Sequence, residues 1–377
     1  MTSRRWCSRL TPWIACMALG LLTACGGVSR PKPAEIVNVP VSQNLNTLWS
    51  AAVGPLTPNL WPALTPNHLV LANQASELIA IQLSDGAITE RLTLGQTLSA
   101  GVGSDGIRHA VVTRQNTLLV ISKGKEVWRH TLPAQVFTPP LVAGERVFVL
   151  LADRSLMAFD AKSGFKLWTH SRPGDPLVLR QPGTLMAFQN TLVAGLSGRL
   201  TGLNPTTGQV VWDAPFANSR GLNDLERLVD VVGATHRHNE SLCARAYFSQ
   251  VACIDANRGL VLWSRSAQGD QGLAGMPQQV VGVESNGLVV AWQRANGDRL
   301  WESDRLKYRR LSAPLATSKA IWIGDEDGQV YLLDPQNGQL TQRLRIDGSP
   351  LAAPPVQRNE VVYLTTRNGT VRAVRAP

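Results

Sequence analysis

The chain has 377 residues and a formal net charge of +10, from 37 Lys and Arg against 27 Asp and Glu. Its apolar content of 44%, with 32 Gly and 23 Pro, excludes intrinsic disorder and argues against an all-helical bundle. Beyond the N-terminus no apolar run reaches about 18 residues, so we expect no membrane-spanning helix in the body of the chain.

The N-terminus resembles a bacterial lipoprotein signal peptide. Three arginines lie within the first nine residues, an apolar stretch follows at residues 13–22, and residues 22–26 read Leu-Thr-Ala-Cys-Gly. We therefore expect residues 1–24 to be removed and Cys25 to carry the lipid, with an ordinary secretory signal as the alternative. No acidic residue follows the cysteine, which favours the outer membrane as the location.

Residues 25–44 are expected to form a lipidated tether, because this segment is rich in Pro and polar residues. The remaining body, residues 45–377, carries its positive charges spread along the sequence. No run of Lys and Arg is interleaved with aromatic residues in the way that nucleic-acid binding requires, so no nucleic-acid partner is expected.

A repeated motif organises the body: an alternating strand, an Asp-x-x-x-Gly turn, and a second strand that ends in Trp. The clearest copy spans residues 156–168, with Asp160, Gly164 and Trp168. The turn glycines recur about every 42 residues, at Gly86, Gly124, Gly164, Gly208, Gly259, Gly297 and Gly338. Trp supplies 11 of the aromatic residues, against four Tyr and seven Phe, which indicates a repeated structural position; Glu90 and Gln342 replace it in two copies.

A second hairpin precedes each copy, for example residues 361–364 before Asn368. Four short antiparallel strands per period are the unit of a β-propeller blade. Seven complete hairpins are followed by residues 369–374, which begin an eighth, and residues 45–49 supply its missing last strand. The sequence therefore predicts an all-β protein: an eight-bladed β-propeller of four-stranded antiparallel blades, the last blade completed by the N-terminal strand.

The repeat resembles the quinoprotein-type propeller motif, which pyrroloquinoline-quinone (PQQ) dehydrogenases share with the BamB lipoproteins of the outer-membrane β-barrel assembly machinery (BAM complex). Lipobox, Pro-rich tether and eight blades together are similar to BamB over essentially the whole chain. The resemblance implies a non-catalytic scaffold anchored by lipid in the outer membrane, with its propeller in the periplasm. It implies that the scaffold binds a periplasmic POTRA domain of BamA and assists insertion of β-barrel proteins; contacts with nascent outer-membrane proteins stay open.

A periplasmic quinoprotein-like dehydrogenase or a sugar-binding propeller is the alternative. The dehydrogenases that the repeat resembles use an adjacent cysteine pair and carboxylate ligands for Ca²⁺, whereas this sequence has no Cys-Cys dipeptide. The acidic residues 325–327 fall in an expected hairpin turn, and His236 and His238 lack a nearby further ligand. No nucleophile elbow or phosphate loop occurs. We therefore expect no enzyme activity, no cofactor and no metal.

Insertions fall in one part of the repeat array, because the two longest intervals between turn glycines lie within residues 164–259. In repeat proteins such insertions form loops on one face. The first places an apolar pair beside an arginine at residues 175–180, and the second, residues 216–240, is partly acidic. This is the composition of an apolar anchor with a polar rim, which is typical of a protein interface.

The resemblance to BamB assigns Leu177, Leu179, Arg180 and Asp230 to the POTRA-binding surface. Val232 departs from the family pattern, which has a second Asp at this position. The alternative is that both leucines face a core between blades.

Cys243 and Cys253 are the cysteines of the propeller region. They flank a predicted hairpin whose turn lies near Phe248, so they face each other on adjacent strands. An oxidising periplasm favours a disulfide between them, with two buried thiols as the alternative.

Overall fold

The computed structural model describes residues 31–36, 39–42, 46–172, 178–217 and 228–377. Cys25 and Leu177, two of the residues singled out by the sequence, lie outside these ranges. Within them we find no helix long and apolar enough to cross a membrane. The chain divides into two compact units, residues 1–33 and 34–377, and the following description concerns the second.

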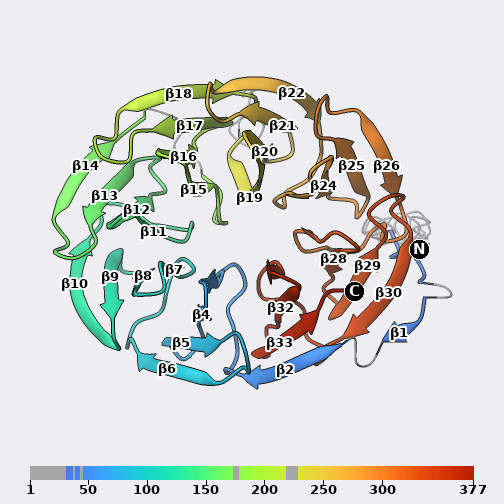
Figure 1. Ribbon diagram of the computed structural model, residues 1–377, viewed down its shortest axis with the longest axis horizontal. Coiled ribbons are helices and arrows are strands. Elements are labelled where there is room, and N and C mark those ends of the chain that lie inside the picture. The colour runs from blue at the N-terminus through green and yellow to red at the C-terminus, as the bar shows by residue number, and fades with distance from the viewer. Residues whose placement is uncertain (1–30, 37–38, 43–45, 173–177, 218–227) are drawn as a thin grey trace, which may run out of the picture. The chain divides into compact units, whose positions relative to one another are not determined.

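The described strands of residues 34–377 form eight sheets arranged as blades around an axis (Figure 1). From the axis outwards, blades 1 to 4 contain β3 (Ala63–Leu64), β4 (His68–Ala72), β5 (Glu77–Gln82), β6 (Ile88–Thr93); β7 (Gly103–Ser104), β8 (Arg108–Val112), β9 (Thr117–Ser122), β10 (Lys125–Thr131); β11 (Leu141–Ala143), β12 (Arg146–Leu150), β13 (Leu156–Asp160), β14 (Lys166–His170); β15 (Leu185–Phe188), β16 (Thr191–Gly195), β17 (Arg199–Leu203), β18 (Val210–Pro215). Blades 5 to 8 contain β19 (Val231–His238), β20 (Ser241–Ala246), β21 (Gln250–Asp255), β22 (Leu260–Ser266); β23 (Ala274–Gly275), β24 (Gln279–Val283), β25 (Val289–Gln293), β26 (Arg299–Ser303); β27 (Leu315–Ala316), β28 (Ile321–Gly324), β29 (Gln329–Leu333), β30 (Leu340–Arg345); β31 (Val356–Arg358), β32 (Val361–Thr365), β33 (Thr370–Arg375), β2 (Thr47–Ala52). The architecture confirms the predicted fold class.

Strand composition follows position in the blade. The two middle strands are buried on both faces between neighbouring blades, and they read as nearly continuous apolar runs, as β12 does with four of its five residues buried. The outermost strand has one face in solvent. In β14 only Trp168 is buried, so the outer strands alternate while the middle strands do not.

The two ends of the propeller meet in blade 8. Strand β2 pairs antiparallel with β33, with Trp49 opposite Ala373, so the N-terminal strand completes the last blade as predicted. Figure 1 shows the blue strand β2 beside the red strand β33. Because β2 is the outer strand of blade 8, this pairing joins the first and last described parts of the ring and covers the edge of β33.

Tryptophan connects neighbouring blades at six junctions. At these junctions the outer-strand indole lies against the turn glycine of the following blade, where a Cβ would overlap the Trp side chain. The pairs are Trp49 and Gly86, Trp128 and Gly164, Trp168 and Gly208, Trp212 and Gly259, Trp263 and Gly297, and Trp301 and Gly338. Indole N–H groups also donate to backbone carbonyls of the following blade, as Trp128 does to Ala161 at 3.0 Å. The repeated Trp therefore acts as a clamp between blades.

Where Trp is replaced, the contact between blades changes. Glu90 of β6 lies 3.8 Å from Nε2 of the buried His109 of blade 2. Burial lowers the pKa of His109, and the nearby Glu90 carboxylate opposes that shift. At this junction the space beside the turn glycine, Gly124, is open, with no atom within 4 Å of an added Cβ. The blade 1 to blade 2 junction therefore has a polar pair where six other junctions have an indole, and a shared apolar cluster also joins these two blades.

The N-terminal segment extends blade 7. Strand β1 (Val41–Ser42) pairs in parallel with β30 and makes this the one five-stranded sheet among the described strands. The backbone N–H of Ala34 donates to Lys307 at 2.9 Å, Arg309 donates to the Ala34 carbonyl at 3.0 Å, and Ile36 packs on the core between blades 6 and 7. The last part of the segment that the sequence assigns to a tether thus belongs to the same compact unit as the propeller.

The clamp predicts unequal effects for one substitution at two turn glycines. Gly164 and Gly124 both have positive φ, 74° and 68°, so alanine at either should cost about 1 kcal/mol of backbone strain. Only at Gly164 would the new Cβ also lie 2.6 Å from the Trp128 ring. We expect Gly164→Ala to lower the free energy of unfolding by about 1 to 3 kcal/mol more than Gly124→Ala does, measured by urea unfolding. Equal effects would contradict the clamp.

Candidate partner-binding site

The described residues that follow the two insertions meet beside the inner strands of blades 4 and 5. The first insertion leads into β15 and the second into β19, and Figure 1 shows these strands next to each other. An isolated antiparallel bridge joins Gly183 to Val232, and the N–H of Gly233 donates to the Pro182 carbonyl at 2.8 Å. These backbone contacts bring the described parts of both loops onto one surface.

Asp230 links the two loops through its carboxylate. Oδ2 accepts the backbone N–H of Leu179 at 3.3 Å, and Oδ1 lies 3.4 Å from the guanidinium of Arg154. Only 18% of the Asp230 side chain is exposed, and Arg154 is buried in the hairpin turn between β12 and β13 of blade 3. Asp230 is thus engaged within the chain and positions loops from three blades.

Leu179 and Arg180 differ in exposure although they are adjacent. Leu179 is half-buried and lines a cavity of about 60 Å³ together with Leu150 and Val231, whereas the Arg180 side chain is exposed. Leu179 belongs to none of the hydrophobic core clusters of the described residues. We call the surface formed by Leu179, Arg180 and Asp230 the patch. It has an apolar residue at a small hollow, with a cation beside it.

Val232, where the family pattern has an acidic residue, is buried at 1% exposure in β19. Its neighbour across the sheet is Arg245 on β20. A valine suits this buried position, and it offers no polar contact to a partner. Among the described residues, Asp230 is therefore the one that supplies a negative charge to the patch.

Arg154 is the residue of this site that sequence reasoning missed. It stands in an Asp-Arg-Ser turn that looks like any other hairpin turn of the repeat, and it has a positive φ of 64°. Sequence carries no signal that a turn arginine folds inwards to reach a carboxylate 76 residues away. Phe248 is 39% exposed at the tip of the β20–β21 hairpin, in the turn that the sequence predicts.

A larger cavity of about 500 Å³ lies among the loops near the axis. Its lining includes Gln181, Trp61, Glu284, Arg309 and Arg367, so both signs of charge are present. Gln181 lines both this cavity and the hollow beside Leu179, and it donates to the Asp270 carbonyl at 3.2 Å. This mixed lining has no dominant charge that would select one class of small ligand.

The acidic turn at residues 325–327 and the histidine pair both make structural contacts. Asp325 accepts hydrogen bonds from Tyr331 at 2.8 Å and from Arg309 at 3.1 Å, and its backbone turn connects β28 to β29. Burial and the Asp325 carboxylate raise the pKa of Tyr331. His236 is bonded through Nδ1 to Arg294 at 2.6 Å. No group of three or more potential metal ligands occurs among the described residues.

Comparison with known proteins decides between the two families that share this repeat. A sequence model described as outer membrane protein assembly factor BamB matches residues 74–303. A BamB from Burkholderia pseudomallei is 32% identical over 96% of this chain and 97% of its own length, and one from Bordetella pertussis is 30% identical over 97% of each. The chain belongs to the BamB family.

Solved structures agree on the fold. BamB from Moraxella catarrhalis aligns with a TM-score of 0.78 and 24% identity, over 86% of this chain and 99% of that one. Quinohemoprotein alcohol dehydrogenase from Comamonas testosteroni aligns with a TM-score of 0.67 at 12% identity, which shows a shared fold alone. Membership of the BamB family confirms the family that the sequence resemblance predicts, and these relatives bear the name outer membrane protein assembly factor.

The burial of Asp230 predicts a stability effect that an exposed ion pair would not give. Asp230→Ala removes the acceptor of the Leu179 N–H and the carboxylate beside buried Arg154, and we expect it to lower the free energy of unfolding by about 1 to 3 kcal/mol. The matched control is Asp298→Ala, because Asp298 lies at the same 3.4 Å from Arg265 but 64% of its side chain is exposed. This control should cost less than about 1 kcal/mol. Indistinguishable urea midpoints would contradict the positioning role.

Proposed function

We propose that this chain is a scaffold lipoprotein of the BAM complex that assists assembly of β-barrel proteins into the outer membrane. Its propeller lies in the periplasm and binds a periplasmic POTRA domain of BamA through the surface around Leu179 and Arg180. The proposal draws on the BamB family membership, since the relatives bear the name outer membrane protein assembly factor. It also draws on the contact between Asp230 and Leu179, which holds the two inserted loops together.

The chemistry of the patch suits a protein partner. A half-buried leucine can enter an apolar pocket of the partner, and an exposed arginine can make a charge-assisted hydrogen bond at the rim. A loop held by a carboxylate from a neighbouring blade also loses less conformational entropy on binding than a free loop does. Leu177, which the sequence places in the same patch, lies outside the described residues.

Substitution at the patch should weaken binding to the BamA periplasmic domain. Leu179→Asp places a charge at the apolar centre and Arg180→Ala removes the rim cation, and at a true hot spot each should cost about 2 kcal/mol. That corresponds to an affinity lower by about thirtyfold, measured by calorimetry with purified BamA POTRA domains.

Arg258→Ala is the matched control for Arg180→Ala, because Arg258 is 75% exposed in a turn between β21 and β22. It should leave the affinity unchanged. Melting temperatures separate binding from folding: Leu179→Asp would instead support a core role if binding and melting temperature fell together. Unchanged affinity in both patch variants would place the partner surface elsewhere on the propeller.

The proposed lipid anchor predicts a change of location without a change of fold. Cys25→Ser removes the sulfur that would carry the lipid, while the described fold of residues 34–377 does not contain this position. We expect the variant to leave the membrane fraction in high salt and to keep its melting temperature. Retention in washed membranes would contradict lipidation at Cys25.

A further inference from the structure

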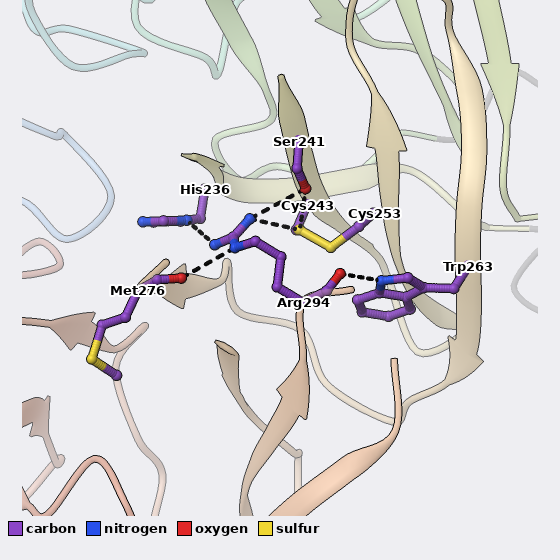
Figure 2. The surroundings of a disulfide bond; sticks show 7 residues. All are labelled: His236, Ser241, Cys243, Cys253, Trp263, Met276 and Arg294. Carbon is purple, nitrogen blue, oxygen red and sulfur yellow. Dashed lines mark hydrogen bonds between the residues drawn. A yellow bond between two sulfur atoms is a disulfide. The ribbon is translucent and has the colours of Figure 1, made fainter. Parts of the chain in front are cut away.

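A disulfide in blade 5 lies at the boundary with blade 6 (Figure 2). Cys243 on β20 is bonded to Cys253 on β21, directly opposite in the register, and both residues are fully buried. They pack in the core cluster that includes Trp292 of blade 6. In this setting the two sulfurs face side chains from the neighbouring blade.

One of those side chains is Arg294, which follows β25. Trp263 holds its backbone by donating the indole N–H to the Arg294 carbonyl at 2.6 Å, the same clamp that recurs around the ring. The guanidinium then reaches back to blade 5 and donates from Nη1 to the Cys243 sulfur at 3.1 Å, as Figure 2 shows. The clamp thus fixes an arginine beside one particular sulfur.

The other partners of this guanidinium are neutral. Its Nε donates to the Met276 carbonyl at 3.1 Å, and its two terminal nitrogens contact Ser241 Oγ at 3.4 Å and His236 Nδ1 at 2.6 Å. Among the described residues no carboxylate forms an ion pair with Arg294. Arg245, two residues along β20 from Cys243, is buried as well, but it is paired with Glu284 at 2.9 Å.

The cluster carries a positive charge at neutral pH. Burial lowers the pKa of Arg294 to about 10, which leaves the side chain protonated. Burial, and then the Arg294 cation, lower the pKa of His236 to about 4, so the ring is neutral and its Nδ1 accepts from Arg294. A buried cation is expensive without an anion, and a disulfide sulfur is only a weak acceptor.

We propose that Cys243 and Cys253 form a thiol–disulfide exchange site in which Arg294 is the counter-ion of a Cys243 thiolate. Reduction would supply the anion that the guanidinium lacks, since a thiolate beside an arginine is stabilised relative to its thiol. A stabilised thiolate is also the better leaving group in disulfide exchange. The co-reactant is a dithiol reductant. A cavity of about 440 Å³ is lined by Ser241 and Arg294, which both contact Cys243, and the two cysteines are not among its lining residues.

The exchange proceeds in two balanced steps. A thiolate of the reductant attacks the Cys253 sulfur, the bond to Cys243 breaks, and Cys243 leaves as a thiolate paired with Arg294. The second thiol of the reductant then displaces Cys253, which takes up a proton, and the reductant becomes a cyclic disulfide. Two electrons enter the protein; the reductant loses two protons, of which one goes to Cys253 and one to solvent.

The released proton gives the proposal a distinctive pH dependence. Above the pKa of the Cys243 thiol, the ratio of reduced to oxidised protein in a fixed dithiothreitol couple should rise about tenfold per pH unit. The other ionisable groups near the site are His238, Glu240 and Asp255, which line the cavity, and none of them hydrogen-bonds Cys243 or Arg294 in the described structure. Arg294 is therefore the group to vary.

The experiment uses the full chain with Cys7, Cys16 and Cys25 changed to Ser, equilibrated with dithiothreitol from about pH 6 to about pH 8. Acid quenching, alkylation and mass analysis give the reduced fraction. In the part of this range above the Cys243 pKa, we expect the tenfold rise per pH unit in this parent, in Arg294→Lys, and in Arg265→Met, which changes an exposed arginine of blade 5. In Arg294→Met the ratio should be flat. A flat parent, or the parental slope in Arg294→Met, overturns the proposal.

A second measurement does not depend on how well the Arg294 variants fold. Thiolate absorbance near 240 nm is titrated in the Cys253→Ser form of the parent, where Cys243 is the remaining cysteine. We expect the pKa of the Cys243 thiol to lie below about 7. In the Cys243→Ser form, the pKa of the Cys253 thiol should lie near the ordinary value of about 8.5. A Cys243 thiol that titrates near 8.5 also overturns the proposal.

Discussion

The contact between an outer-strand indole and the turn glycine of the next blade is the interaction on which this propeller depends. A single blade cannot bury its faces, so the ring requires a specific junction repeated between neighbours. The glycine provides both the positive φ of the turn and the space for the ring, as at Gly164 against Trp128. The indole hydrogen bond adds direction to a contact that is otherwise apolar, and it fixes the spacing of the blades.

The same junction explains why the main features of the fold can be predicted from the sequence. A period of turn glycines with Trp four residues later specifies blade number, strand order and the closing strand at Trp49, because each feature is local and repeated. The same signal shows where the junction differs: Glu90 stands in a Trp position, and in the structure its carboxylate faces His109.

The remaining features depend on contacts that the repeat pattern does not predict. Asp230 is an acidic residue in an insertion, and only the inward turn of Arg154 makes it a positioning group. The parallel pairing of β1 with β30 is similar: two residues of a Pro-rich segment reach a sheet about 300 residues away through backbone hydrogen bonds, which depend little on side-chain identity. Arg294 beside Cys243 likewise joins two blades through one long side chain.

A rigid ring with loops tied across three blades can hold a partner in a fixed orientation, and we propose that this partner is a POTRA domain of BamA. In-cell photocrosslinking tests it most directly, with a photoreactive amino acid placed at Arg180 and, in a parallel strain, at the outer-edge position Arg258. The account predicts a crosslink between position 180 and a POTRA domain of BamA, with none from position 258. Crosslinks to BamA from position 258 but not from position 180 would contradict it.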